Sequence, residues 1–248
     1  MKTCRVSTLI SAVLLFIHAS ALAENLDLQL ESGGVWFSKN DARIPGDTGT
    51  KFDLMELTGD GPDPYIRLYA TYNFNEQHAL RLTFAPLEVN GTGMLSKNVL
   101  FEGELFAADT PTKGTYKFST YRMTYRRMFD ASEPWRWGLG ATLLIRDAEI
   151  ALEQGAKRQS KDDLGLVPLL HLYGEYRFTD QVDFILDVDG AWSPAGRAVD
   201  MALKAQYGFD NGWYASLGYR TLEGGADNDD TYTFAWIHFA QIAVGCRF

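Results

Sequence analysis

The stretch that decides the fold is Trp236-Ile237-His238-Phe239-Ala240-Gln241-Ile242-Ala243-Val244-Gly245-Cys246-Arg247-Phe248. In an extended strand, successive side chains point to opposite faces. One face would carry Trp236, Ala240, Ile242, Val244, Cys246 and Phe248. The other face would carry Gln241, Gly245 and Arg247. One apolar face and one mixed polar face are typical of a strand that crosses a membrane in a β-barrel, with its apolar face in lipid.

The other end of the chain has the features of a secretory signal peptide. Lys2 and Arg5 precede the apolar run Leu9–Ile17, and the small-residue site Ala21-Leu22-Ala23 follows it. The apolar run is much shorter than the roughly 20 residues that a membrane-spanning helix needs. We therefore predict export through the Sec pathway, with a signal peptide over residues 1–23 and a single domain over residues 24–248.

Cysteine usage narrows the sources of stability. Cys4 lies within the predicted signal peptide, so the mature chain keeps Cys246 alone. An internal disulfide is then impossible, and an exported chain without disulfides has to be stabilised by a core or by a membrane.

Composition is compatible with membrane insertion through strands. Aromatic residues make up 13% of the chain, yet the mean hydropathy is only -0.18. Alternating strands hide their hydrophobicity in this way, because each lipid-facing residue is followed by a lumen-facing one. The formal charge of -9 becomes -11 when Lys2 and Arg5 are removed, since -9 minus 2 is -11. This acidic balance argues against nucleic acid as a partner.

Ten segments of the mature chain show period-two alternation. They cover residues 26–38, 64–74, 78–88, 115–129, 135–148, 165–178, 182–193, 197–209, 213–223 and 231–248. The predicted short connections are Phe74–Gln77, Asp130–Pro134, Phe178–Gln181 and Phe209–Gly212. The predicted long ones are Lys39–Asp63, Glu88–Thr115, Glu149–Leu164 and Glu223–Asp230, with Ser193–Gly196 as a short exception on the same side. Membrane barrels place short turns in the periplasm and long loops outside, so ten strands leave both termini periplasmic.

The sequence therefore predicts an all-β fold, a transmembrane antiparallel up-and-down β-barrel of about ten strands. Twelve strands are the alternative, because Val99–Phe106 could supply an extra pair. An odd number would place the termini on opposite sides of the membrane. A soluble β-sandwich is the other alternative, but it explains neither the terminal aromatic residue nor the alternating loop lengths.

Alternation also predicts a lumen that contains many charges of both signs. The predicted lumen-lining charged network is Arg67, Arg81, Arg122, Arg126, Arg146, Glu175, Arg177, Asp183, Asp187, Asp189, Arg197, Asp200, Lys204 and Arg220, with Glu31 and Arg136 beside it. Unpaired charges in a narrow interior are costly, so most of these groups should form ion pairs and hydrogen bonds. Such a network either closes and stiffens the barrel or lines a narrow polar conduit or binding cavity, where the excess of basic groups would favour an anion.

No constellation in the mature chain points to catalysis, a cofactor or a metal. His78 falls in a predicted turn, and His171 faces inward without a serine at a relay position. His238, with Asp187 and Asp189, partly matches the acidic pairs of omptin-type proteases, but Trp236 stands where their Asp-x-His pattern has Asp. The acidic loop Glu223–Asp230 lacks the regular ligand spacing of an EF-hand calcium loop. We expect no catalytic residue, no metal and no cofactor.

Several stretches resemble uncharacterised proteobacterial outer-membrane barrel proteins, and this resemblance covers most of the mature chain. They are Tyr116–Arg122, Ile145–Ile150, Val167–His171 and Gly218–Asp227. The resemblance implies the outer membrane of a Gram-negative bacterium as the location. It also implies that the terminal Phe248 is the signal read by the barrel-assembly machinery, and that outer-membrane lipid surrounds the protein. It carries no activity and leaves the oligomeric state open.

Three functions remain after these steps. The first is a narrow channel or binding barrel for a small polar solute, with an anion favoured. The second is a closed structural or surface-interaction barrel. The third is a barrel enzyme, a protease or a lipid-modifying enzyme, with an extracellular site around Asp187, Asp189 and His238.

Overall fold

The computed structural model describes residues 25–129, 134–194 and 196–248. The predicted signal peptide lies outside these ranges, as do residues 130–133 of the predicted turn Asp130–Pro134 and residue 195 of the predicted turn Ser193–Gly196. No helix in the described ranges is long and apolar enough to cross a membrane.

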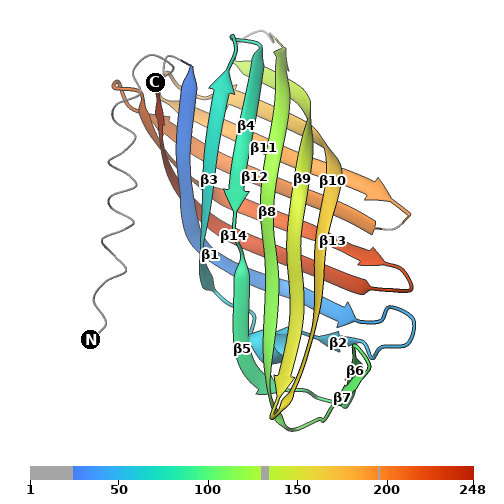
Figure 1. Cartoon of the computed structure of the whole chain (residues 1–248). Coiled ribbons are helices and arrows are strands. Elements are labelled where there is room, and N and C mark those ends of the chain that lie inside the picture. Colours follow the sequence, from blue (N-terminus) through green and yellow to red (C-terminus); the bar gives the residue numbers. More distant parts are fainter. Residues whose placement is uncertain (1–24, 130–133, 195) are drawn as a thin grey trace.

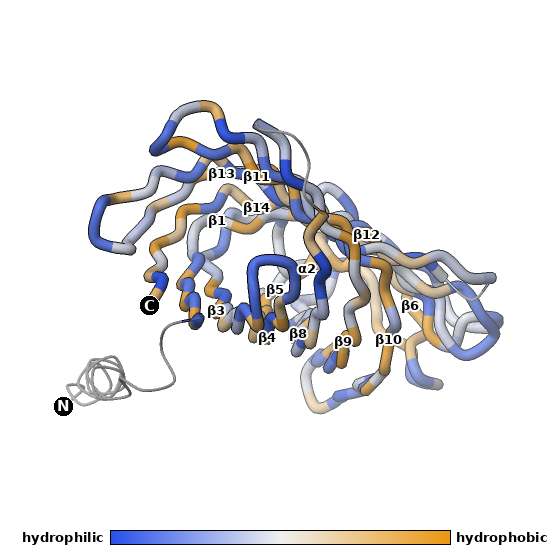
Figure 2. The backbone as a smooth tube through the Cα atoms, turned by 90° about the horizontal axis from the view of Figure 1, so that it is seen from above, coloured by the Kyte–Doolittle hydropathy of each residue, from blue (hydrophilic) through white to orange (hydrophobic). Residues whose placement is uncertain are grey.

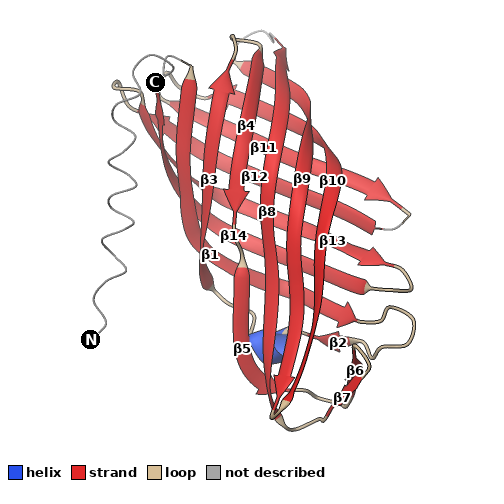
Figure 3. Ribbon diagram, in the orientation of Figure 1, coloured by secondary structure: helices blue, strands red, loops and turns tan. Residues whose placement is uncertain are grey.

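Ten antiparallel strands close into a barrel (Figures 1 and 3). They are β1 (Leu26–Arg43), β3 (Asp63–Asn73), β4 (His78–Ala85), β8 (Pro111–Phe129), β9 (Trp135–Gln154), β10 (Lys157–Arg177), β11 (Val182–Ser193), β12 (Gly196–Gly208), β13 (Trp213–Asp227) and β14 (Tyr232–Arg247). Each pairs with its neighbour in this order, and β14 pairs with β1 from Asp27↔Arg247 to Arg43↔Tyr232. The prediction of an all-β transmembrane barrel of ten strands is confirmed.

Four short strands lie outside this ring of ten. β5 (Glu88–Met94) follows β4 in the chain and continues the same wall of the barrel by pairing with β8. β2 (Phe52–Asp53) pairs with the end of β1. β6 (Val99–Phe101) and β7 (Glu104–Phe106) form a separate hairpin. The segment Val99–Phe106 is therefore an extracellular arm, and the twelve-strand alternative is wrong.

Alternation places apolar side chains outside and polar ones inside, as in the middle of β8. Tyr121, Met123 and Tyr125 are exposed on the outer face, whereas Arg122 and Thr124 are buried inside. Figure 2 shows the same alternation as hydrophobic and hydrophilic residues that follow each other along the strands. This surface suits lipid, because an aqueous protein rarely exposes so continuous an apolar band.

The two chain ends of the barrel meet at the end that the alternation of turns assigns to the periplasm. The N–H of Phe248 donates to the carbonyl oxygen of Leu26 over 2.9 Å, directly after the last pair of β14 with β1. The Phe248 side chain remains about half exposed on the outer surface. Its role as an assembly signal stays a prediction.

Two predicted loops are largely strand. β9 and β10 extend to a tight turn between Gln154 and Lys157, so most of the predicted loop Glu149–Leu164 is paired. β13 likewise continues to Asp227. Charged residues suggested loops here, but they form cross-strand ion pairs on a wall that has risen out of the lipid. Arg158, for example, donates to Glu153 over 2.8 Å. Charged side chains on the outer face of these strands indicate where the strands leave the lipid. They do not end the strands, because they pair with charges on the neighbouring strand.

The outer half of the barrel is filled on one side by its loops. Residues 44–62, which include the short helix α2 (Met55–Thr58), fold back against β1, β5 and β8. The β6–β7 hairpin is attached to them, since the N–H of Glu102 donates to the carbonyl oxygen of Ile44 over 3.1 Å. They bury an apolar cluster in which Ile44, Leu54, Leu95, Phe101 and Phe106 are at most 1% exposed. This loop core closes one side of the outer half and leaves the opposite side free.

The close contact between α2 and β5 depends on the absence of a side chain at Gly93. A β-carbon at this position would fall on the carbonyl oxygen of Glu56 in α2. We expect Gly93→Ala to destabilise the loop core by about 1–3 kcal/mol, as overpacking does in other cores. The measurement is cleavage of loop 44–62 by an added protease in reconstituted vesicles. Gly34→Ala is the matched control, because the nearest atom to its new β-carbon would be 3.5 Å away; equal cleavage of the two variants would contradict this packing.

Candidate functional site: a closed charged layer beneath an open cleft

The middle of the barrel is a layer of buried charged side chains together with one buried histidine. They come from seven strands and are at most 6% exposed: Glu31, Arg67, Arg122, His171, Asp187, Asp189, Asp200, Lys204 and Arg220. Inward-facing positions of neighbouring strands fall at one height because the register brings them opposite each other, as in Glu31↔Arg67 and Asp189↔Asp200. We call this set, together with Arg81, the charged layer.

In one half of the charged layer, the cations gather around Asp200. Its carboxylate accepts from Arg220 Nη1 over 2.7 Å and pairs with Arg122 Nη2 over 2.7 Å and with Arg67 Nη1 over 3.5 Å. Three guanidinium groups from β3, β8 and β13 therefore converge on one carboxylate from β12. Such charge-assisted contacts hold distant strands together across the lumen.

In the other half, the donors gather around Glu31 of β1, which is 0% exposed. Its oxygens accept hydrogen bonds from Tyr65 over 3.2 Å and from Tyr69 over 3.1 Å. Lys204 lies 3.5 Å away and Arg220 Nε 3.6 Å away. Arg220 thus joins the Glu31 and Asp200 halves of the charged layer.

β11 supplies the remaining carboxylates. Asp189 accepts from Arg122 over 3.0 Å and from Thr142 over 2.7 Å, and His171 Nδ1 lies 2.9 Å from it. Asp187 is paired with both terminal nitrogens of Arg81. A water-filled conduit would leave these groups exposed to solvent, so their burial and mutual pairing indicate a closed interior at this height.

A cavity of about 500 Å³ lies directly on the extracellular side of the charged layer. Its floor includes Arg122, Asp189 and Asp200, which belong to that layer. Its walls come from β8, β9 and β10 on one side and from β12, β13 and β14 on the other. They include Phe118, Leu144, Ile150, Val167, Leu169, Ala198, Leu222, Thr233 and Ala235. We call this cavity the outer cleft. Its volume is in the range of small-molecule sites. Its lining combines these apolar side chains with charged ones, which include Arg146, Glu149, Lys161, Asp162 and Asp163.

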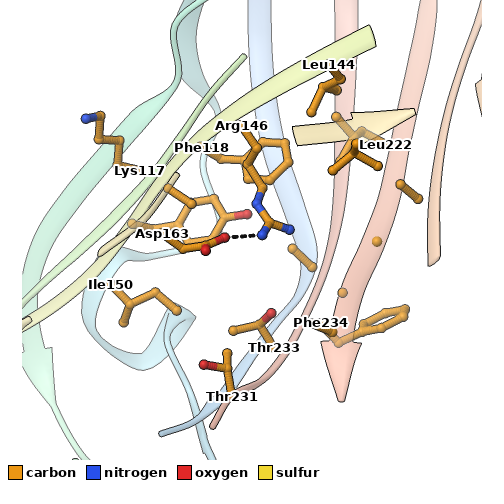
Figure 4. A pocket seen from close by; sticks show the side chains of 18 of the residues that line it. Lys117, Phe118, Leu144, Arg146, Ile150, Asp163, Leu222, Thr231, Thr233 and Phe234 are labelled. Carbon is orange, nitrogen blue, oxygen red and sulfur yellow. Dashed lines mark hydrogen bonds and ion pairs between the residues drawn. The ribbon is translucent and has the colours of Figure 1, made fainter. Parts of the chain in front are cut away.

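One ion pair crosses the wall of the outer cleft. Arg146 of β9 donates to Asp163 of β10, and Figure 4 shows this pair with Leu222, Thr231 and Thr233 on the opposite side. Lys117 points away from the cavity in the same view, and its ammonium group is 2.7 Å from Asp147. Lys161 at the rim lies 3.5 Å from Glu102. Each of these cations has a carboxylate partner, as do Arg122 and Arg197, so none of the described cations that line the cleft is unpaired.

Other residues of the predicted lumen network lie below the charged layer, toward the periplasmic end. The guanidinium of Arg126 stacks on Tyr173 at 3.9 Å, and Tyr173 donates to Glu175 over 3.0 Å. Asp183 is half-buried and Arg177 is exposed at the end of β10. These groups share the lumen with the charged layer, but they lie away from the outer cleft.

The predicted inward position of Arg197 is wrong. Arg197 alternates with the inward residues Ala198 and Asp200, and it is 53% exposed on the outer face. It pairs there with Glu223 and lies over the ring of Phe234 at 5.2 Å. The charge of Arg197 suggested the lumen, but its place near the outer end of β12 allows it to face water above the lipid.

The hypothesis of a site built from Asp187, Asp189 and His238 is also not supported by their positions. The two aspartates are buried inside the barrel, whereas His238 lies on the outer face. His238 Nε2 lies 2.8 Å from Ser38 Oγ, and its ring stacks with Trp36 at 5.6 Å. The barrel wall therefore separates the histidine from the carboxylates. His78 lies 2.6 Å from Tyr125 Oη at the opposite end of the barrel.

Comparison with solved structures supports the fold. The chain is similar to the outer membrane protease OmpT from Escherichia coli, with a TM-score of 0.54 and 10% identity over 91% of this chain and 97% of that chain. It also matches the attachment invasion locus protein Ail of Yersinia pestis, with a TM-score of 0.39 and 12% identity over 90% and 99%. No family model matches the sequence, and no curated protein matches it. The chain has the fold of outer-membrane β-barrels.

The apolar walls of the outer cleft were not predicted as a site. Leu144, Leu169 and Leu222 alternate inward on their strands, where they break a run of polar lumen residues. Apolar residues at inward positions above the charged residues were the available signal.

Proposed function

We propose that this protein is a non-conducting binding barrel of the Gram-negative outer membrane, whose outer cleft takes a small solute with an apolar body and uncharged polar groups. The observation that carries the proposal is the outer cleft above a closed charged layer. A solute that enters from outside meets a built floor instead of a passage. The binding half of the channel-or-binding hypothesis is therefore favoured over the conducting half.

The pairing of the charges supports an uncharged solute over an anionic one. Arg122 is already shared between Asp189 and Asp200, and Arg146 is bonded to Asp163. An anion in the cleft would gain no free cation, and it would lose its hydration. A solute with an apolar body instead gains from contact with Leu144, Leu169 and Leu222, at roughly 25 cal/mol per Å² of apolar surface removed from water. This changes the expected ligand from an anion to an uncharged compound.

The test uses a polarity-sensitive fluorophore inside the outer cleft. Cys246→Ser removes the single cysteine of the mature chain, and Thr233→Cys places a label on the inward face of β14 beside the cavity. The probe is hexyl β-glucoside added to reconstituted vesicles. We expect a saturable blue shift. The control is the unaltered chain labelled at Cys246, at the periplasmic end, which should not respond.

A second titration separates uncharged from anionic ligands. Hexyl phosphate has the same chain and a charged head, so it should bind at least about tenfold more weakly, since leaving a charge without a partner costs more than 1.4 kcal/mol. A response equal at both labels would show bulk partitioning and would contradict a site in the cleft. Tighter binding of the phosphate would return the anionic ligand.

A further inference from the structure

The barrel wall is incomplete beside the outer cleft. β10 pairs with β9 along its whole length, from Lys157↔Gln154 to Tyr176↔Trp135, but with β11 only over Leu170–Arg177. Among the described residues, Lys157–Leu169 therefore form an edge without a strand partner on the β11 side. At roughly 3.3 Å per residue this edge is about 40 Å long. Figure 1 shows the reason: the outer parts of β8, β9 and β10 run down, whereas β11 to β14 slant away to the right.

The sequence of Lys157–Leu169 is typical of a strand edge that stays unpaired. Pro168 has no N–H to offer a neighbouring strand, and proline is confined to edges and bulges of sheets. Lys161, Asp162 and Asp163 supply charges farther along, which discourage pairing with another strand. We call the space between β10 and the β11–β12 hairpin the lateral opening.

At the end nearest the membrane-embedded wall, the lateral opening has an apolar rim. Leu164 and Leu170 of β10 are 77% and 78% exposed, and Trp192 at the tip of the β11–β12 hairpin is 81% exposed. They are the three most exposed large apolar side chains of the described residues. Leu172 and Phe184, which are nearer the periplasmic end, lie on the same outer face. The apolar outer band of the barrel therefore extends to the opening.

The outer cleft reaches this opening. It is lined by Val167 and Leu169 from β10 and by Ala198 and Val199 from β12, which lie on the two sides of the gap. Val199 belongs to the outer, lipid-facing row of β12, with Met201 and Leu203. A cavity lined by both inner Ala198 and outer Val199 passes from the lumen toward the outside of the wall.

We propose that the outer cleft receives an acyl chain of an outer-leaflet lipid, which enters sideways through the lateral opening. The proposal rests on the proposed function, because it names the ligand of that same cleft. The apolar rim of the lateral opening lies at the end of the apolar outer band, where it faces hydrocarbon. An acyl chain also suits walls whose cations are all paired with carboxylates. The lipid head group remains outside, near the charged stretch of β10 over residues 157–163.

The test is photo-crosslinking in vesicles of phosphatidylcholine that carries a diazirine at the end of one acyl chain. After irradiation, peptide mass spectrometry locates the attached lipid. Outward residues such as Leu170 and Leu172 should be labelled in any case. The proposal predicts additional labelling of inward Val167 and Leu169. Labelling confined to outward residues would overturn it.

Two substitutions on β12 provide the matched control. Ala198→Phe fills the cleft from the inner face, and Met201→Phe adds the same ring on the outer row of the strand, at a residue that does not line the cleft. We expect loss of inward labelling in the first variant and unchanged labelling in the second. Folding of both is checked by their heat-dependent migration in detergent gels, and Ala198→Leu replaces the first if it does not fold. Equal inward labelling in both variants would contradict entry into the cleft.

The two proposals can fail separately. If inward labelling is absent while the label at position 233 still responds to hexyl β-glucoside, binding in the cleft stands, with access from the extracellular side, and lateral entry falls. If both signals are absent, the proposed function falls with it.

Discussion

Replacing Asp200 by asparagine should lower the free energy of unfolding by about 3–5 kcal/mol, the usual effect of removing one partner from a buried ion pair. The substitution keeps the shape of the side chain but removes its charge. Arg67, Arg122 and Arg220 would then converge on a neutral amide in a site where Asp200 is 4% exposed. The cost arises mainly from guanidinium groups left buried and undercompensated.

Urea unfolding in lipid vesicles, followed by tryptophan fluorescence, measures this effect. Asp147→Asn is the matched control, because it makes the same chemical change in a partly exposed pair with Lys117, in which the two side chains are 34% and 28% exposed. Exposed pairs contribute about 0–1 kcal/mol. If the two variants unfold at the same urea concentration, Asp200 does not hold the charged layer together.

Replacing Phe101 by alanine should destabilise the loop core by about 3–5 kcal/mol, as is usual for a buried Phe. Phe101 is 0% exposed, and its ring meets Phe52 at 6.1 Å and Phe106 at 6.3 Å in edge-to-face contacts. Removal of the ring leaves a cavity between the β6–β7 hairpin and loop 44–62. The strands in lipid do not touch this cavity, so the barrel itself should stay folded.

Protease cleavage in intact vesicles, with mapping of the cut sites, checks this prediction. We expect new cuts over residues 95–110 and an unchanged membrane-embedded fragment. Leu105→Ala on the same hairpin is the control, because Leu105 is 51% exposed and its truncation should leave cleavage as it was. Resistance of the Phe101 variant would show that other contacts suffice to hold the loops.

The fold was predictable because alternation in a lipid-facing strand is a strong physical constraint. Tyr121, Met123 and Tyr125 must face hydrocarbon, so their neighbours Arg122 and Thr124 must face the lumen. Strand number followed from the turns. Strand ends did not follow, because a strand that leaves the membrane exchanges apolar for charged side chains without changing its backbone, as β9 does after Ile145.

The charged layer was predictable as a set of residues but not as a set of pairs. Alternation places Arg122, Asp189 and Asp200 in the lumen, whereas their meeting depends on strand tilt and register across the barrel. The lateral opening was not predictable at all, because it results from the different directions of β10 and β11. Pro168 and the charged residues Lys161, Asp162 and Asp163 carry local signs of it. A single proline near the middle of a predicted strand admits several explanations, and the charges suggested a loop.

The closed charged layer is tested most directly by single-channel recording of the refolded mature protein in a planar bilayer with a salt gradient. Burial and pairing of Glu31, Arg122, Asp187, Asp189 and Asp200 predict a correctly folded, heat-modifiable barrel that gives no steady conductance. A steady, anion-selective conductance that changes its selectivity in Arg122→Glu would contradict a closed charged layer, because it would show an open path lined by the same residues.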